Sequence, residues 1–257
     1  MSPRVIRAIL ITQAIIIVLL LGLIYTSVRE NETPALNPGQ ATLFQRSIYD
    51  AQEPNTYGDI AELFPINSHN EKLQWHDVDG EKFLRVVSWM RDDVYNDYYA
   101  EDQKDKSLAT VAQGVQIWVS AVPQLLEFCQ SLSVADKHFR IKQYLGLNPD
   151  NLYERIVELL VKPSQLFRPC PDPEIDDEVC DLALSEASTV RSKEWPDYFN
   201  TMRSSMYGPD GAPWTRLGYT YDWSFGRRNV GASEYILIPG STYYVDTSYS
   251  TEEYCDF

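Results

Sequence analysis

The sequence predicts an α+β fold in which a single transmembrane helix precedes one mixed-sheet domain outside the cytoplasm. Three observations lead to this prediction. Twenty consecutive residues near the N-terminus carry no charge, all four cysteines follow that run, and strand-like and helix-like patterns alternate without a regular strand–helix–strand rhythm. We expect four segments: a short cytoplasmic tail at 1–7, a transmembrane signal anchor at 8–27, a polar linker at 28–55 and a disulfide-stapled α+β domain at 56–257.

The apolar run at 8–27 has the length of a membrane span. As an α-helix it would be ~30 Å long, which is about the thickness of the hydrocarbon core of a bilayer. Arg4 and Arg7 precede the run, whereas the first acidic residues of the chain, Glu30 and Glu32, follow it. Because basic residues stay on the cytoplasmic side, the sequence predicts a cytoplasmic N-terminus and an extracytoplasmic domain.

An uncleaved anchor competes with two alternatives. A cleaved secretory signal has a shorter apolar core and small residues before the cut. Here the best cut, after Ser27, would put Tyr25 where a small residue is needed. The other alternative is a buried core helix. The length of the run favours the uncleaved anchor.

Polar residues and prolines follow the run. Pro34, Pro38, Gly39 and Pro54 are typical of a spacer, so we expect the segment 28–55 to separate the domain from the membrane. About 200 residues remain, which is enough for one domain with a substantial core.

The chain is strongly acidic. Its formal net charge is −15, and because Arg4 and Arg7 lie before the apolar run, the part beyond that run has a charge of −17. Nucleic acids and anionic lipid headgroups are bound through basic residues, so neither is an expected partner. The expected partners are the membrane, through one helix, and an envelope protein or a glycan.

Cysteine usage predicts two disulfides. An even number of cysteines in an oxidising compartment usually pairs. Of the three pairings, we expect Cys170–Cys180, because the intervening Pro171 and Pro173 favour a turn, which leaves Cys129 to pair with Cys255. The spacing includes no CxxC pair, so no zinc site is expected, and neither a metal nor a cofactor is predicted.

Two segments in the first half of the domain predict strands. Residues 82–90 are apolar on both faces, as expected of a central strand, and residues 115–122 alternate between apolar and polar. Pro123 fits the first position of a helix that continues to Leu132.

The next segments favour helices. Ser133 and Asp136 resemble a capping box before a helix that extends through Tyr144. The pair at 148–149 could open another helix over residues 152–160. Both segments also fit strands, because their apolar spacing allows a period of two.

The last third of the chain predicts one more helix and one or two strands. A polar helix is expected over residues 192–206, followed by turn residues. The segment 234–245 predicts two short strands, or one strand broken at Pro239 and Gly240.

An aromatic segment at 212–223 is the candidate binding region. Aromatic rings next to polar groups suit the stacking of sugars and are enriched at protein interfaces. Alternation places three of the rings on one face of a strand. The alternative is a core strand that is buried under the helix containing Trp195. The candidate ligand-binding residues are Trp214, Arg216, Tyr219, Tyr221, Asp222 and Trp223.

The segments 166–175 (LFRPCPDPEI) and 213–223 (PWTRLGYTYDW) resemble a group of uncharacterised bacterial proteins, notably cyanobacterial ones. The resemblance extends over residues 82–255. It implies a shared extracytoplasmic, here periplasmic, domain with paired cysteines, and it implies no activity.

Other chemistry-bearing residues match no known motif. The acidic runs at 92–105 and 172–181 lack the spacing of a calcium-binding EF-hand loop, so solvated loops are expected there. The three histidines, His69, His76 and His138, lie in unrelated contexts. Nucleophile elbows, phosphate-binding loops and dinucleotide fingerprints are also missing from the sequence.

We therefore expect a membrane-anchored, non-catalytic binding or assembly module of the cell envelope. The alternative is an envelope enzyme that acts on glycan or peptidoglycan with a pair of carboxylates. Its catalytic residues are unknown from sequence, and Asp222 and Glu234 are the acids nearest to the aromatic segment. An enzyme would show a cleft with converging carboxylates, and a binding module would show an exposed apolar patch.

Overall fold

The structure is a computed structural model that describes residues 38–52, 61–208, 210–224 and 229–256. The expected tail and anchor at 1–27 lie outside these residues. Within them, we find no helix with the length and apolar character that a bilayer span requires. Residues from Pro38 onward form one compact unit.

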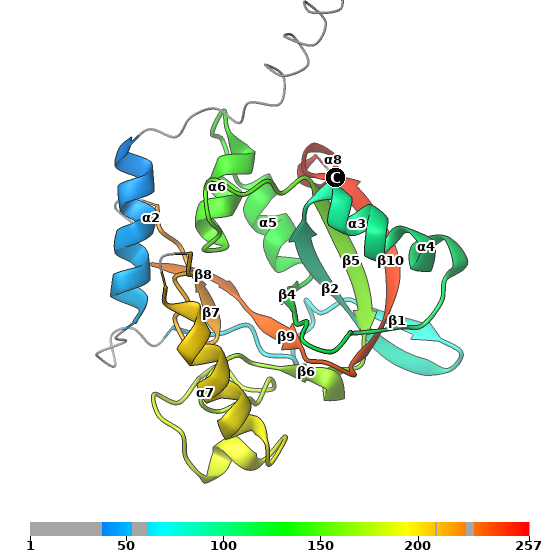
Figure 1. Ribbon diagram of the computed structural model, residues 1–257. Helices are drawn as coiled ribbons and strands as arrows, with labels where there is room; N and C mark the ends of the chain where they lie inside the picture. The colour runs from blue at the N-terminus through cyan, green and yellow to red at the C-terminus, as the bar shows by residue number, and fades with distance from the viewer. Residues whose placement is uncertain (1–37, 53–60, 209, 225–228, 257) are drawn as a thin grey trace, which may run out of the picture. The chain divides into compact units, whose positions relative to one another are not determined.

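The elements of this unit mix helices and short strands (Figure 1). The helices are α2 (Pro38–Ala51), α3 (Asp92–Tyr98), α4 (Ala100–Asp105), α5 (Gln124–Gln130), α6 (Lys137–Tyr144), α7 (Trp195–Met206) and α8 (Thr251–Cys255), with 3₁₀ turns at Pro163–Gln165 and Glu186–Thr189. The strands are β1 (Trp75–Val78), β2 (Glu81–Met90), β3 (Ala109–Thr110), β4 (Ile117–Ala121), β5 (Arg155–Val161), β6 (Leu166–Phe167), β7 (Tyr219–Tyr221), β8 (Val230–Ser233), β9 (Tyr235–Leu237) and β10 (Thr242–Ser250).

Eight of the strands form one antiparallel sheet in the order β3-β10-β5-β2-β4-β9-β6, and β1 adds a hairpin to β2. The remaining two strands, β7 and β8, form a separate antiparallel ribbon. Helices and strands follow one another without repeated crossovers, so the predicted α+β class is confirmed.

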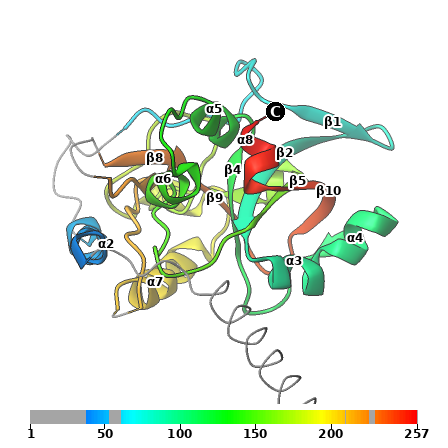
Figure 2. The ribbon, with the colours of Figure 1, turned by 90° about the horizontal axis from the view of Figure 1, so that it is seen from above.

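The central strand β2 is buried on both faces, as its apolar run predicts. Leu84 and Val86 belong to the larger core cluster on one face of the sheet. Val87 and Trp89 belong to a second cluster on the opposite face, with residues of α5, α6 and α8. Figure 2 shows these three helices next to one another. The alternating strand predicted at 115–122 is β4, also in the sheet.

The ends of two predicted helices differ from expectation. Pro123 is the N-cap of α5 rather than its first residue. α6 begins at Lys137, and its cap is Asp136, whose Oδ1 accepts a hydrogen bond from the Phe139 backbone N–H at 2.8 Å. The prediction of a capping box that begins at Ser133 is therefore wrong, because the helix starts one turn later.

The segment 152–160, which fits both a helix and a strand by sequence, forms the strand β5 over most of its length. This strand lies between β2 and β10, with Val157 on one face of the sheet and Ile156 on the other. A buried central strand needs apolar residues on both sides, so its sequence resembles a buried helix.

The predictions for the last third agree well with the structure. The helix expected over 192–206 is α7. The two expected strands after 234 are β9 and β10, separated by a turn in which Gly240 has a φ of +88°, a conformation that favours glycine.

The segment expected to be a polar linker contains α2. In this helix Phe44, Ile48 and Ala51 are buried against Tyr221 and Trp223, and so part of the predicted spacer belongs to the core. The three buried apolar residues of α2 share one face of the helix, and the folded unit starts at Pro38 instead of residue 56.

Both expected disulfides are present. Cys129 of α5 is bonded to Cys255 of α8, with a Cα–Cα distance of 5.3 Å, and this bond ties the end of the described chain to the sheet-covering helices. Cys170 is bonded to Cys180, with a Cα–Cα distance of 6.5 Å, and this bond closes the acidic loop between them.

Candidate functional site

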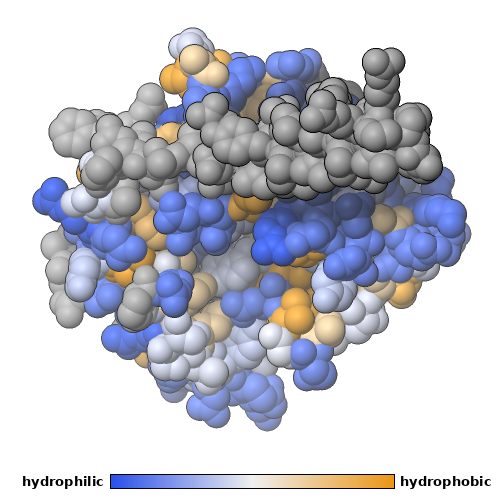
Figure 3. Space-filling model, turned by 45° about the horizontal axis from the view of Figure 1, so that its top comes forward, coloured by the Kyte–Doolittle hydropathy of each residue, from blue (hydrophilic) through white to orange (hydrophobic). Residues whose placement is uncertain are grey.

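The aromatic segment at 212–223 is part of the core. Trp214 and Trp223 are 3% exposed, Tyr219 is 5% exposed and Tyr221 is 8% exposed. These rings cannot form an open contact surface, so the expectation of an exposed aromatic face is wrong. The face shown in Figure 3 is mostly hydrophilic, with small separate hydrophobic areas.

The rings of this segment also do not share one face. Tyr221 and Trp223 pack against α2, where the Trp223 and Phe44 ring centroids are 5.7 Å apart. Tyr219 belongs to a different cluster, next to the Cys170–Cys180 disulfide. The pairing of β7 with β8 is irregular between Tyr219 and Tyr221, which breaks the simple alternation on which the prediction rested.

Trp214 is buried under α7. This agrees with the alternative prediction, in which the aromatic segment is buried under the helix that contains Trp195. Its ring packs against Phe199 of that helix at a centroid distance of 5.4 Å. Arg216 donates a hydrogen bond to the backbone oxygen of Gln52 and lies over the ring of Tyr207.

Asp222 is neutralised by a buried arginine. Arg140 of α6 donates from Nη1 to Oδ1 at 3.0 Å and from Nη2 to Oδ2, and both side chains are almost fully buried. The Ser224 backbone N–H also donates to Oδ1 of Asp222. With these partners, Asp222 joins α6 to β7 and has a structural role.

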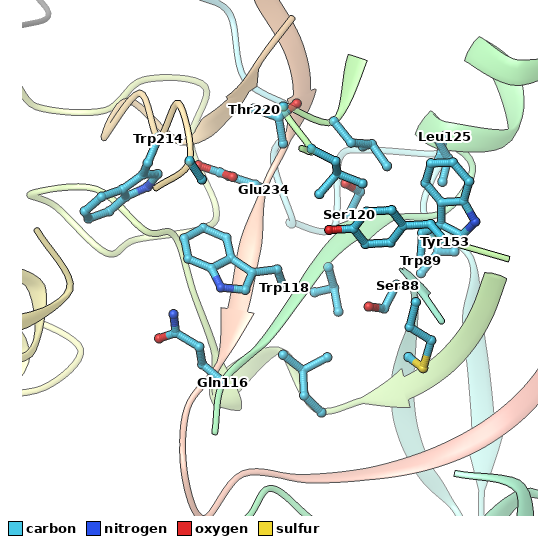
Figure 4. Close-up of a pocket in the computed structure, with 18 of the residues that line it drawn as sticks. Ser88, Trp89, Gln116, Trp118, Ser120, Leu125, Tyr153, Trp214, Thr220 and Glu234 are labelled. Atoms are coloured by element: carbon cyan, nitrogen blue, oxygen red, sulfur yellow. The ribbon is translucent and has the colours of Figure 1, made fainter. Parts of the chain in front are cut away.

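The structure brings another part of this region into a cavity of about 420 Å³ (Figure 4). Its walls come from β2, β4, the loop between α6 and β5, the segment 212–214 and β7. Most lining residues are apolar or aromatic, including Trp89, Trp118, Tyr153, Trp214 and Tyr221. The volume lies in the range of small-molecule sites. Trp214 and Tyr221 are the predicted ligand-binding residues that line this cavity.

Glu234 contributes a carboxyl group to the wall of this cavity. Among the described residues that line it there is no second carboxylate and no lysine, arginine or histidine. Glu234 is 6% exposed, and its Oε1 has no hydrogen-bond partner in the described part of the chain. Figure 4 shows the carboxyl group next to the side chains of Trp118 and Trp214.

Burial raises the pKa of Glu234 to about 8, and the indole N–H of Trp214 partly offsets this effect. Removal of a carboxylate from water disfavours its charged form, and here no nearby cation restores that form. Glu234 is therefore mainly protonated at neutral pH in the empty cavity.

The backbone on both sides of Glu234 fixes its place. The Glu234 N–H donates to the Gly218 oxygen at 2.9 Å, and the preceding Ser233 N–H donates to Oε1 of Gln124 at 3.0 Å. The next residue, Tyr235, is fully buried and donates from its hydroxyl to the Phe64 oxygen. Glu234 thus lies between β8 and β9, in backbone that hydrogen bonds hold on both sides.

The cavity has an accessible edge at Val115, which is 47% exposed although it lines the cavity. The adjacent Gln116 is held there because its Oε1 accepts a hydrogen bond from the Tyr198 hydroxyl at 2.8 Å. Val115 and Gln116 therefore define the side from which a ligand would enter.

The acidic runs bind cationic side chains of the protein. Asp92 pairs with Arg155 at 2.8 Å, and Asp177 pairs with Arg168 at 2.6 Å. Among the described residues, no three His, Cys, Asp or Glu side chains group in a way that could hold a metal ion. In the disulfide loop, burial and neighbouring acids raise the pKa of Asp172 to about 6.

The three histidines are not among the residues that line the cavity. His69 and His76 are exposed. His138 packs edge-on against Trp89, with ring centroids 4.7 Å apart, and its Nε2 is hydrogen-bonded to the Tyr153 oxygen.

Asp222 and Glu234, the two acids nearest to the aromatic segment, do not line the same cavity in the described part of the chain. Asp222 is bound by Arg140 and is not among the lining residues of the cavity that contains Glu234. The sequence drew attention to Glu234 through its nearness to the aromatic segment. One further signal was available, because Glu234 is the single acid within the apolar run at 230–238. The cavity itself has no local signal, since its walls come from segments between residues 87 and 234.

Comparisons with known proteins add no functional assignment: no protein-family model, no curated protein and no solved structure matches this chain.

Proposed function

We propose that this protein is a membrane-anchored binding module of the cell envelope, and that the cavity next to Glu234 holds a small, largely apolar molecule. The observation that supports this most directly is a ligand-sized apolar cavity that contains one buried carboxyl group, whose Oε1 has no hydrogen-bond partner among the described residues. A buried polar atom without a partner costs free energy, and a ligand that bonds to it would remove that cost.

The lining argues for an apolar ligand rather than a saccharide. A sugar in a buried site needs many hydrogen-bond partners for its hydroxyl groups. The described polar side chains of this cavity are few, namely Ser88, Gln116, Ser120, Thr220 and Glu234 with the phenol and indole groups. A glycan or an envelope protein would then be a partner of the outer surface.

The proposed location follows from the sequence of the N-terminal part. The charge-free run at 8–27 has the length of a span, and the basic residues before it favour a cytoplasmic N-terminus. The two disulfides support an oxidising compartment, which for a bacterial protein of this kind is the periplasm. In this arrangement the anchor keeps the binding domain at the outer side of the membrane.

A substitution at the accessible edge of the cavity tests the proposed function. We expect the neutral fluorescent probe N-phenyl-1-naphthylamine to bind the full-length chain with enhanced emission. The variant Val115→Trp should weaken this binding at least tenfold, because the larger ring occupies the entry side.

The matched control is Val134→Trp. Val134 is 46% exposed, against 47% for Val115, and it is not among the residues that line the cavity. This variant should bind the probe as the parent does. Equal binding by the parent and both variants would contradict the proposal, and so would the failure of the parent to bind.

A further inference from the structure

Glu234 differs from Asp222 and Glu158, two other buried acids, because no cationic side chain pairs with it among the described residues. Asp222 is paired with Arg140, and Glu158 lies 3.5 Å from the Nε of Arg85. Described residues lining the cavity of Glu234 include no cationic side chain. A buried carboxyl group in an apolar cavity that opens toward solvent is a site at which a ligand can supply the missing positive charge.

The aromatic neighbours of Glu234 suit a cation. The indole rings of Trp118 and Trp214 lie beside the carboxyl group, with centroids 6.2 Å apart and an interplanar angle of 82° (Figure 4). The face of an indole ring attracts ammonium groups, and aromatic cages next to an acid are a common way to bind them.

The net negative charge of the whole chain also favours a cationic ligand. A formal net charge of −15 attracts cations to the protein and repels anions. The rest of the lining, which includes Met90, Val119 and Leu147, offers apolar surface to the remainder of a ligand.

We propose that the cavity binds a hydrophobic amine, with its ammonium group paired with Glu234 on the cavity side of Trp118 and Trp214 and its apolar body along β2 and β4. This inference rests on the proposed function and specifies the ligand class of the same site. The ammonium group donates hydrogen bonds to the orphaned Oε1, and the carboxylate compensates its charge.

A neutral ligand with a hydrogen-bond acceptor is the competing occupant, because a protonated Glu234 can donate a hydrogen bond. The two occupants require different chemistry from residue 234. An amine needs the negative charge, whereas an acceptor needs a donor, and a glutamine side chain keeps a donor but loses the charge.

The test compares two ligands of nearly equal shape, 1-naphthalenemethylamine and 1-naphthalenemethanol. Isothermal titration calorimetry on the full-length chain at pH 8 should show that the amine binds at least tenfold more tightly than the alcohol. In Glu234→Gln this preference should disappear, while the alcohol still binds. The retained binding of the alcohol shows that the variant is folded and that its cavity is open.

The matched charge control is Glu252→Gln, which removes an exposed acid of α8 and should keep the preference for the amine. Equal affinity for amine and alcohol in the parent would overturn the inference and leave the proposed function intact. A preference that persists in Glu234→Gln would also overturn it. If neither ligand binds the parent, the proposed function itself fails.

Discussion

Glu234 lies where a carboxylate is least stable, and this has a consequence for the pH dependence of folding. Its pKa is about 8 in the folded protein, against an ordinary value of 4.5. Between these two values the native state binds more protons than the unfolded state. The contribution of Glu234 to the free energy of unfolding therefore falls as the pH rises from about 4.5 to 8, and this contribution is constant above that range.

We expect the parent to lose on the order of a few kcal/mol of stability between pH 5 and pH 8.5 through this group. Urea unfolding at the two pH values measures the change. Glu234→Gln, which does not titrate, should lose clearly less. Asp172, whose raised pKa of about 6 has the same sign of effect, is present in both proteins and cancels in the comparison. Parallel pH profiles for the two proteins would show that Glu234 is ionised when folded.

The residue types of the site were predictable, but their burial was not. The run at 212–223 is visibly rich in aromatic residues, and Glu234 is conspicuous in its apolar surroundings. Aromatic residues have the same local pattern in a core strand and on a binding surface. What decides between the two is whether another element covers them. Of the two covering helices, α7 directly precedes the aromatic segment, whereas α2 is distant in sequence.

At the scale of elements, the segments with strong periodicity were predicted well. β4 follows from its alternation, β2 from an apolar run, and α7 from a polar segment that ends in turn residues. β5 stayed open because its apolar spacing fits both a helix and a strand. α2 was missed because Pro38 and Gly39 at its start suggest a spacer, and its buried face depends on contacts with Trp223 across the domain.

The packing of α2 gives a prediction for the element. Phe44 is 2% exposed and contacts Trp223, so Phe44→Ala should lower the free energy of unfolding by about 3 kcal/mol. Tyr49 in the same helix is 75% exposed, and Tyr49→Ala should change stability by less than about 1 kcal/mol. Chemical denaturation of the three proteins measures both values. Similar losses in the two variants would mean that α2 does not dock through Phe44.

At the scale of the whole molecule, the oxidation state of the cysteines depends on the compartment to which the proposed anchor directs the domain. If residues 8–27 direct the domain across the membrane, their removal leaves the cysteines in the reducing cytosol. The full chain should stay in the membrane fraction after alkaline carbonate extraction and show no free thiol on alkylation.

A chain that lacks residues 1–27 should instead be extractable and carry four thiols that react with a maleimide. Mass spectrometry of alkylated protein counts these thiols directly. The proposed location would be contradicted if carbonate released the full chain from the membrane fraction, or if the full chain carried thiols that react.

The order of the strands has a further consequence for how the chain reaches its native state. β10, the last strand in sequence, lies inside the sheet between β3 and β5, and Tyr243 pairs with both Ala109 and Val161. A nascent chain cannot complete the sheet until residues 242–250 have left the ribosome and, in the proposed topology, the translocon. Until then the edge of β5 that pairs with β10 and the thiol of Cys129 remain open, so this domain should depend on chaperones and oxidoreductases that act after residues 242–255 have emerged.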